Sequence, residues 1–265
     1  MEIRQLLTIY DQEQRRDVVY PSEERQVLPS VVRHVGIFNQ VLYTELDENN
    51  ADAVIREQIA YFAEREFEWK YFTHDTPPDL LERLTKHGFA IGEAEAILIL
   101  DLESAPESLF APVKHDVRRI TDPADIPGIM TVQSQVFSDR NSSEDDPHVR
   151  QLTDELRSAP DQLSIYAVYT DAGAVASSAW VRLPANNRFA SLWGAATLPQ
   201  YRNQGFYTAL MSIRIQEARA RGRRFVTVDA SPMSRPILSK FGFQWITTSH
   251  PCQWPGKPNN KPATV

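Results

Sequence analysis

The sequence is poor in cysteine, with Cys252 as the single one among 265 residues. One cysteine can form neither an internal disulfide nor a cysteine-based zinc site, and we expect Cys252 to pack in the interior rather than act as a nucleophile. The sequence also lacks any apolar run near the roughly 20 residues that cross a membrane. Its first residues are too polar for a signal peptide, so we expect a cytoplasmic protein with no membrane partner and no bound metal.

An excess of positive charge is missing too. The chain has 28 lysines and arginines against 35 aspartates and glutamates, which gives a formal net charge of −7. Nucleic acid is therefore not an expected partner, whereas an acidic surface weakly favours a cationic or amine substrate. The rest of the composition, 42% hydrophobic and 24% charged, is that of a globular protein with one or two domains.

What the sequence does contain is a series of strand and helix patterns. In the first hundred residues, strand patterns at 31–46 and 94–102 flank a helix pattern at 51–65. Residues 103–116 hold two prolines and little periodicity, which predicts a linker. A second series follows, with several strands and a long helix at about 205–221. The last fifteen residues are rich in proline and are expected to be partly disordered.

An internal repeat relates the two series. When the sequence is shifted by 154 positions, residues 71–89 align with residues 225–243, and seven of these nineteen positions are identical. Ordinary residue frequencies would give about one identity. The identical pairs are Thr73/Thr227, Asp75/Asp229, Pro78/Pro232, Leu84/Leu238, Lys86/Lys240, Gly88/Gly242 and Phe89/Phe243. The repeat indicates two related units, although strand–helix–Gly-Phe segments can also look alike without a common origin.

The segment most informative about chemistry is TLPQYRNQGFYTALMSIRIQEARARG, at 197–222. A strand ends there, a turn with Pro199 follows, and Arg202-Asn203-Gln204-Gly205 lead into a helix. The first N–H groups of a helix lack intrahelical acceptors and its N-terminus carries partial positive charge, so this junction favours a phosphate group. Gly205 permits close backbone approach. An ordinary strand–turn–helix junction is the simpler alternative, and no GxxxxGK[ST] or GxGxxG nucleotide motif is present.

These features resemble the GNAT superfamily of N-acetyltransferases. The pyrophosphate loop of that family reads Q/R-x-x-G-x-G/A after a strand and a turn, and this chain has Arg202-x-x-Gly205-x-Tyr207. The family's next strand, short helix and terminal Gly-Phe correspond to FVTVDA, the helix after it and the Gly-Phe at 242–243. The resemblance covers about 113–250. It implies an α/β fold with a central mixed, mostly antiparallel sheet flanked by helices, present here as two tandem related units.

The resemblance also implies acetyl-CoA as the acetyl donor. The pantetheine of the donor would hydrogen-bond to the strand before the loop, and its pyrophosphate would lie on the loop amides. The positions implied for donor binding are Ala195, Ala196, Thr197, Arg202, Asn203, Gln204, Gly205, Phe206, Tyr207, Thr208 and Ser231. Tyr207 departs from the family pattern, because a bulky side chain stands where the family has Gly or Ala.

The family's general base and acid have no counterpart in this sequence. The position of the family's general-acid tyrosine is Leu238 and that of its catalytic glutamate is Ser191, and neither side chain can do acid–base work. Asp229 ends a strand near the expected thioester, where it could bind the amine or accept its proton. Asp75 holds the same place in the first repeat, however, so a turn or cap role for Asp229 is the alternative.

Other polar and aromatic residues have ordinary explanations. The acidic loop at 144–146 could attract a cationic amine but is expected to be a solvated surface loop, and His148 is expected at the surface. His115 has no clustered ligands for a metal. Trp193 is expected in the core or as a wall of the acceptor site.

The first repeat provides a comparison for the phosphate loop. Its matching positions are Glu48, Asn49, Asn50 and Ala51, preceded by Glu45 and Asp47. With neither Gly nor Arg, and with three carboxylates that repel a pyrophosphate, this half should not bind the donor. We therefore expect a GNAT-like domain without a cofactor loop at 1–105, a linker at 106–112, a GNAT domain at 113–258 and a flexible tail at 259–265.

The expected activity is transfer of an acetyl group from acetyl-CoA to a primary amine of a small molecule or peptide by direct attack, without a covalent enzyme intermediate. Two alternatives stay open. One is a non-catalytic module that binds or senses acetyl-CoA, which Leu238 and Ser191 favour. The other is a scaffold that has lost the donor, which Arg202 and Gly205 disfavour. A different acyl group is compatible with the sequence, as are a monomer and a homodimer.

Overall fold

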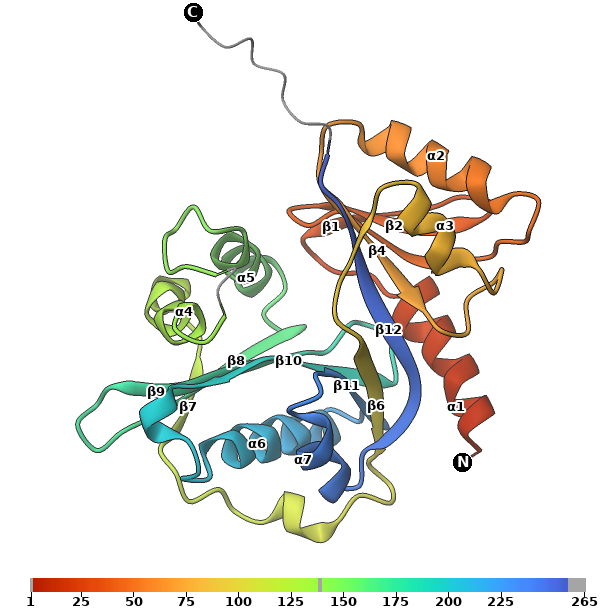
Figure 1. Cartoon of the computed structure of the whole chain (residues 1–265). Helices are drawn as coiled ribbons and strands as arrows, with labels where there is room; N and C mark the ends of the chain where they lie inside the picture. Colours follow the sequence, from red (N-terminus) through yellow and green to blue (C-terminus); the bar gives the residue numbers. More distant parts are fainter. Residues whose placement is uncertain (1, 138–139, 257–265) are drawn as a thin grey trace, which may run out of the picture. The chain divides into compact units, whose positions relative to one another are not determined.

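The computed structural model describes residues 2–137 and 140–256, and the chain divides into two compact units (Figure 1). The first unit comprises Met1–Asp17, Glu23–Ile97 and Ile246–Val265, and the second comprises Val18–Ser22 and Leu98–Trp245. Each unit is therefore built from separate stretches of the chain. None of the described helices is long and apolar enough to cross a membrane.

The first unit contains a sheet with the strand order β1-β2-β3-β4-β12, with β5 paired to β12. The strands are β1 (Glu23–Val27), β2 (Val31–Gly36), β3 (Gln40–Thr44), β4 (Phe67–Phe72), β5 (Ala90–Ile91) and β12 (Gln244–Trp254). The helices are α1 (Ile3–Tyr10), which a π-helical turn (Asp11–Arg16) continues, α2 (Ala51–Phe62) and α3 (Leu80–Lys86). β3 and β4 pair in parallel, whereas the β1–β2, β2–β3 and β4–β12 pairs are antiparallel.

The second unit contains a sheet with the strand order β6-β11-β10-β9-β8-β7. The strands are β6 (Glu95–Asp101), β7 (Val117–Ile120), β8 (Leu163–Tyr169), β9 (Val175–Arg182), β10 (Phe189–Thr197) and β11 (Phe225–Ala230). The helices are α4 (Ile126–Ser134), α5 (Pro147–Ser158), α6 (Phe206–Ala220) and α7 (Arg235–Lys240). Figure 1 shows α4 and α5 on one face of this sheet and α6 and α7 on the other. The expected α/β class, with a mixed and mostly antiparallel sheet flanked by helices, is confirmed.

The face of the second sheet under α4 and α5 is closed by an apolar core. Ile126, Ile129 and Met130 of α4 and Val149, Leu152 and Leu156 of α5 belong to one buried cluster with strand residues of β8 and with Trp180 of β9. The helical residues recur at intervals of three and four positions, so each helix presents one apolar stripe to the sheet. Trp180, with 3% of its surface exposed, therefore lies on the face of β9 that α4 and α5 cover.

In the structure, the two halves of the internal repeat have the same order of strands and helices. β3, α2, β4 and α3 of the first unit follow one another as β10, α6, β11 and α7 do in the second. Leu84 and Leu238 are both buried at equivalent helix positions. The glycines that end the two short helices, Gly88 and Gly242, both have positive φ, at 97° and 89°. Such angles favour glycine at the end of a helix.

Two elements of the first unit differ from the sequence-based expectation. The strand pattern at 31–46 folds as the β2–β3 hairpin, and Asn39 accepts a hydrogen bond from the N–H of Gly36 where the chain turns. The N-terminal helix α1 was not expected, although Ile3, Leu6, Leu7 and Tyr10 recur at the spacing of one helix face. Of these residues, Leu6 and Tyr10 are buried.

The segment expected to be a linker, 106–112, is part of the second unit. Leu109 is buried, and the side-chain amide of Gln216 on α6 donates to the carbonyl oxygens of Leu109 and Ala111, both at 2.9 Å. A distant side chain satisfies these backbone groups, so no local pattern predicts that the segment is packed.

The compact units also divide the chain at positions other than 105 and 113. β6 and β12 each run from one unit into the other, so the second unit begins at Leu98 and ends at Trp245. Residues 251–254, expected to be in a disordered tail, form the end of β12. The tail expected at 259–265 lies outside the described residues.

Candidate functional site

The parallel strands β10 and β11 separate after three residue pairs. The pairs are Phe189 with Phe225, Ala190 with Val226 and Ser191 with Thr227. β10 continues for six residues beyond Ser191 and β11 for three residues beyond Thr227, and in the described structure these ends do not pair with each other. The sheet therefore opens at this point, and an opened sheet presents strand N–H and C=O groups that a ligand can pair with.

A glycine bulge in β10 accompanies the opening. The register between β10 and β9 shifts between Trp193 and Ala196, and Gly194 has φ +60°. A Cβ at Gly194 would lie 2.1 Å from the ring of Trp180, so the strand can pass the indole only with glycine there. The amide of Gln133 on α4 donates to the carbonyl oxygen of Gly194 at 2.6 Å. This hydrogen bond from α4 thus fixes the backbone of the bulge.

The loop after β10 leads into α6 through two residues with positive φ. Asn203 has φ +62° and Gly205, the N-cap of α6, has φ +84°. No side chain caps α6, and its first turn holds no acidic residue. The first amides of α6 lack intrahelical acceptors, and the helix dipole makes this end positive. Arg202 is exposed and its Nε donates to the carbonyl oxygen of Thr197 at 3.3 Å, so the loop has the donors and the charge that a phosphate prefers.

His115 borders this loop from a distant part of the chain. A Cβ at Gly205 would lie 3.1 Å from His115 Nε2, and the His115 ring packs edge-on against Phe206 with 4.9 Å between ring centroids. The described residues contain no group of three or more His, Cys, Asp or Glu placed to hold a metal. His115 therefore contacts the loop before α6, which the sequence did not predict because some ninety positions separate the two segments.

In the first unit, the turn before the equivalent helix α2 is closed by its own side chains. Asp47 Oδ1 accepts hydrogen bonds from the N–H groups of Asn49 and Asn50, at 2.7 and 2.9 Å. Asn50 in turn accepts from the N–H of Asp47. The amides of the first unit that align with those of Asn203 and Gln204 are thus bonded to a carboxylate, and the turn before α2 has neither a glycine nor an arginine. The start of α6 has no such carboxylate.

A buried arginine ties α6 to the strands at the opening. The Nη1 group of Arg214 donates to the carbonyl oxygens of Trp180, at 3.0 Å, and of Trp193, at 3.3 Å. Burial lowers the pKa of Arg214 to about 10, so the guanidinium is still charged at neutral pH. Burial also raises the pKa of the neighbouring Tyr207, whose phenol therefore stays protonated. Nothing in the sequence distinguishes Arg214 from a solvated helix residue.

The predicted donor-binding residues cluster around this opening. Ala195, Ala196 and Thr197 form the end of β10, and the loop and first turn of α6 supply 202–208. Two of the strand carbonyls already have partners, because Ser177 Oγ donates to the oxygen of Ala196 and Arg202 donates to that of Thr197. Ser231 lies beyond β11, where its carbonyl accepts from the N–H groups of Ser234 and Arg235. In this structure Ser231 shapes the turn into α7.

The residues considered for acid–base catalysis lie in different environments. Leu238 and Ser191 are buried, with 1% and 4% of their surfaces exposed. Asp229 is half-buried on β11, two residues beyond the last pair with β10. In the first unit, Asp75 accepts from the N–H of Phe72 and from Arg15, which is the turn role that the repeat suggested for this position. Asp229 is thus the carboxylate that β11 carries into the opening.

Two further expectations concern polar residues outside the opening. Asp146 was expected to be solvated, but it is buried and accepts from the N–H groups of Asn141 and His148 as the N-cap of α5. This prediction was wrong because the capping bonds bury the carboxylate. Cys252 is buried in the core of the first unit, and burial raises the pKa of its thiol to about 12. A thiol with that pKa is not a nucleophile at neutral pH.

Comparisons with known proteins agree with this arrangement. Residues 108–230 match the family model described as an acetyltransferase (GNAT) domain. No curated protein matches the sequence. Among solved structures, a GCN5-related N-acetyltransferase from Kribbella flavida is 15% identical, with 95% of each chain covered and a TM-score of 0.65.

Two further solved structures resemble the chain over most of its length. A tandem GNAT protein from the clavulanic acid biosynthesis pathway is 12% identical, with 89% of this chain and 84% of that chain covered and a TM-score of 0.58. A GCN5-related N-acetyltransferase from Sphaerobacter thermophilus is 12% identical, with coverages of 86% and 81% and a TM-score of 0.57. At sequence identities of 12–15%, these similarities show that the fold is shared.

Proposed function

We propose that this chain, whose residues 108–230 match the GNAT acetyltransferase domain, transfers an acetyl group from acetyl-CoA to a primary amine of a small molecule or peptide. The observation that carries the proposal is the opening between β10 and β11, which leads directly to the uncapped start of α6. The matched segment contains both features.

The residues present fit the donor molecule. A pyrophosphate would accept hydrogen bonds from the first amides of α6, where the dipole is positive and Arg202 is close. Gly205 keeps this approach open because it has no Cβ. Its φ of +84° favours glycine, and a Cβ there would lie 3.1 Å from His115 Nε2. The backbone of Ala195, in the bulged end of β10, lies beside the opening that the pantetheine arm would enter. The first unit offers no equivalent, since Asp47 bonds to the turn amides of Asn49 and Asn50 and the turn before α2 contains no arginine or glycine.

The proposed reaction is a direct acyl transfer. The neutral amine attacks the thioester carbonyl carbon, a C–N bond forms, the C–S bond breaks, and the proton lost from nitrogen ends on the thiol of CoA. An amine must be deprotonated to attack, so a nearby carboxylate that binds the ammonium and accepts its proton would help. Asp229 is the residue proposed for this role, because Leu238 has no polar group and the hydroxyl of Ser191 is too weak a base.

Binding and turnover test the proposal separately. Calorimetry should detect acetyl-CoA binding, and a thiol-detecting reagent should report CoA release when a panel of primary amines is added. Acetyl-CoA that does not bind at near-millimolar concentration would rule out the proposal.

A non-catalytic acetyl-CoA-binding module is the second candidate. The burial of Leu238 and Ser191 at the family's acid and base positions favours it. Acetyl-CoA binding without CoA release on any amine would establish this function in place of acetyl transfer.

A further inference from the structure

An exposed tryptophan stands where the sheet of the second unit opens. Trp193 has 37% of its surface exposed, although it lies in the middle of β10. It is paired with Trp180 across the β9–β10 ladder, and paired residues on neighbouring strands share one face of the sheet. Trp180 packs in the core beneath α4 and α5. Trp193 therefore lies on the α4–α5 face, opposite the face that α6 covers.

Asp229 lies on the same face, on the other side of the opening. Ser191 and Thr227 form the last β10–β11 pair, and Trp193 and Asp229 each follow two residues later. Alternate residues of a strand point to the same face, so the indole and the carboxylate flank the opening on its α4–α5 side. The start of α6, where the donor phosphates are proposed to bind, lies on the other side of the sheet (Figure 1). This leaves the α4–α5 side for the acceptor.

A buried ion pair lies beside the indole of Trp193. The guanidinium of Arg182 lies 5.4 Å from the Trp193 ring centroid, and Glu155 of α5 accepts from its Nε at 2.9 Å and from Nη2 at 3.2 Å. Ser22 donates to Glu155 at 2.9 Å. Both charged side chains are at least nine-tenths buried, so the pair is fixed and its charges largely cancel.

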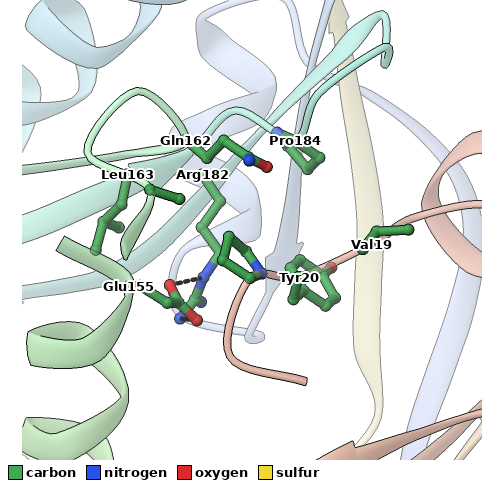
Figure 2. A pocket seen from close by; sticks show the side chains of 9 residues that line it. Val19, Tyr20, Glu155, Gln162, Leu163, Arg182 and Pro184 are labelled. Atoms are coloured by element: carbon green, nitrogen blue, oxygen red, sulfur yellow. Dashed lines mark hydrogen bonds and ion pairs between the residues drawn. The ribbon is translucent and has the colours of Figure 1, made fainter. Parts of the chain in front are cut away.

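The segment Val18–Ser22 closes over this ion pair. Figure 2 shows Tyr20 beside Arg182 and Glu155. Val19, Gln162, Leu163 and Pro184 also line this small pocket. The Tyr20 ring lies 5.9 Å from the Arg182 guanidinium. The pocket has no room for a water molecule. The residues that line it therefore hold Arg182 in place beside the Trp193 ring.

We infer that Trp193 selects the acceptor, favouring a primary amine that carries an apolar or aromatic body. The body would pack on the exposed indole surface while the ammonium faces Asp229 across the opening. An indole offers a large apolar surface with a preference for stacked or edge-on rings. The ion pair behind it adds no net charge that would repel an ammonium. This inference rests on the proposed function and names the class of substrate for that site.

Two amines with the same reactive group test the inference: 2-phenylethylamine and ethanolamine. The wild-type protein should prefer 2-phenylethylamine in kcat/KM, and in affinity measured by calorimetry with CoA present. Trp193→Ala should reduce this preference about tenfold, an effect typical of losing one aromatic contact. The change should lie in the KM for 2-phenylethylamine, with ethanolamine and the acetyl-CoA Kd unaffected.

Trp245→Ala is the matched control. Trp245 is also an exposed tryptophan, 47% exposed, with an arginine guanidinium near its ring, but it lies on β12. This variant should keep the wild-type preference. A wild type without preference for 2-phenylethylamine, or an equal preference in the Trp193→Ala and Trp245→Ala proteins, overturns the inference. The proposed function fails differently, through absence of acetyl-CoA binding or of CoA release with every amine.

Ser22→Ala tests whether the ion pair positions the indole. Loss of one hydrogen bond to Glu155 should raise the KM for 2-phenylethylamine about threefold and leave kcat unchanged. Near-UV circular dichroism would report whether the indoles keep their environment. A change in kcat without a change in KM would show that the segment Val18–Ser22 does not act through Trp193.

Discussion

Gly194 and Gly205 both have backbone angles that a side chain would strain, with φ of +60° and +84°. Gly205 could be predicted from the sequence, because it occupies a fixed place in a short motif before a helix. Gly194 could not, because its angle follows from the ring of Trp180, which lies on another strand and passes where a Cβ would be. Local patterns therefore predicted the glycine turn before α6 but not the bulge in β10.

Gly194→Ala should impair both stability and donor binding. The added Cβ would meet the Trp180 ring at 2.1 Å, and strain with overpacking of this kind costs about 2–4 kcal/mol. Thermal unfolding should show the lowered stability, and calorimetry should show weaker acetyl-CoA binding. The double variant Gly194→Ala with Trp180→Ala removes the clash. If it is no more stable than the sum of the two single changes predicts, the contact with Trp180 is not the cause.

Cys252 should resist alkylation in the folded protein. Its side chain is buried, and burial raises the pKa of the thiol to about 12, so almost no thiolate is present at pH 8. Iodoacetamide should label the protein in urea much faster than in buffer, as followed by mass spectrometry. Cys252→Ala should retain acetyl transfer. Rapid labelling of the native protein would contradict this account of the thiol.

At the scale of elements, the turns that lead into α2 and α6 differ. In the turn before α2 the amides of Asn49 and Asn50 are bonded to Asp47, whereas the loop before α6 contains no carboxylate. The sequence predicted this difference, because carboxylates precede α2 and Arg202 and Gly205 precede α6. It did not predict the N-cap of α5, because an acidic, serine-rich loop has the composition of a solvated segment.

Asp146→Ala should destabilise α5. The carboxylate accepts from the N–H groups of Asn141 and His148, and losing such a cap lowers the free energy of unfolding by about 1–2 kcal/mol. Denaturant unfolding at pH 7 measures the difference. Asp145→Ala, at an exposed neighbour, is the control and should change stability by less than about 0.5 kcal/mol.

The effect of Asp146 should depend on pH. Burial opposes ionisation of this carboxyl, but the N–H donors of Asn141 and His148 outweigh it and lower its pKa in the folded protein. The stabilisation is therefore complete above the unfolded pKa of about 4 and is lost as the pH falls through the lower folded pKa. Wild type and Asp146→Ala should converge in stability in strong acid. A difference that grows as the pH falls would contradict the sign.

At the scale of the whole molecule, the two units exchange stretches of chain. The repeat predicted two related halves, and the order β3-α2-β4-α3 recurs as β10-α6-β11-α7. The boundaries were not predictable from composition. β6 and β12 each run from one unit into the other, and the segment with two prolines before β7 is packed against α6. The sequence of a strand does not show which of the two units the strand will join.

A fragment cut at the sequence-based boundaries should not fold. Residues 113–258 lack β6, whose end is bonded to the β11 region through Leu98 and Leu102, and they lack the buried Leu109. β11 would become an edge strand, paired to β10 alone. The amide spectrum of this fragment should be poorly dispersed, whereas that of the full chain should be well dispersed. A dispersed spectrum for 113–258 would show that β6 is dispensable.

The most direct test of the central claim compares two glycines at opposite ends of α6. Gly205 and Gly222 both have positive φ, +84° and +71°, but a Cβ at Gly205 would approach His115 Nε2 at 3.1 Å and one at Gly222 would enter open space. Both alanine variants strain the backbone, and only one alters the proposed phosphate site. Calorimetry with acetyl-CoA should show affinity reduced about tenfold or more by Gly205→Ala and unchanged by Gly222→Ala. Equal affinity in wild type and Gly205→Ala would contradict the claim that the start of α6 binds the donor.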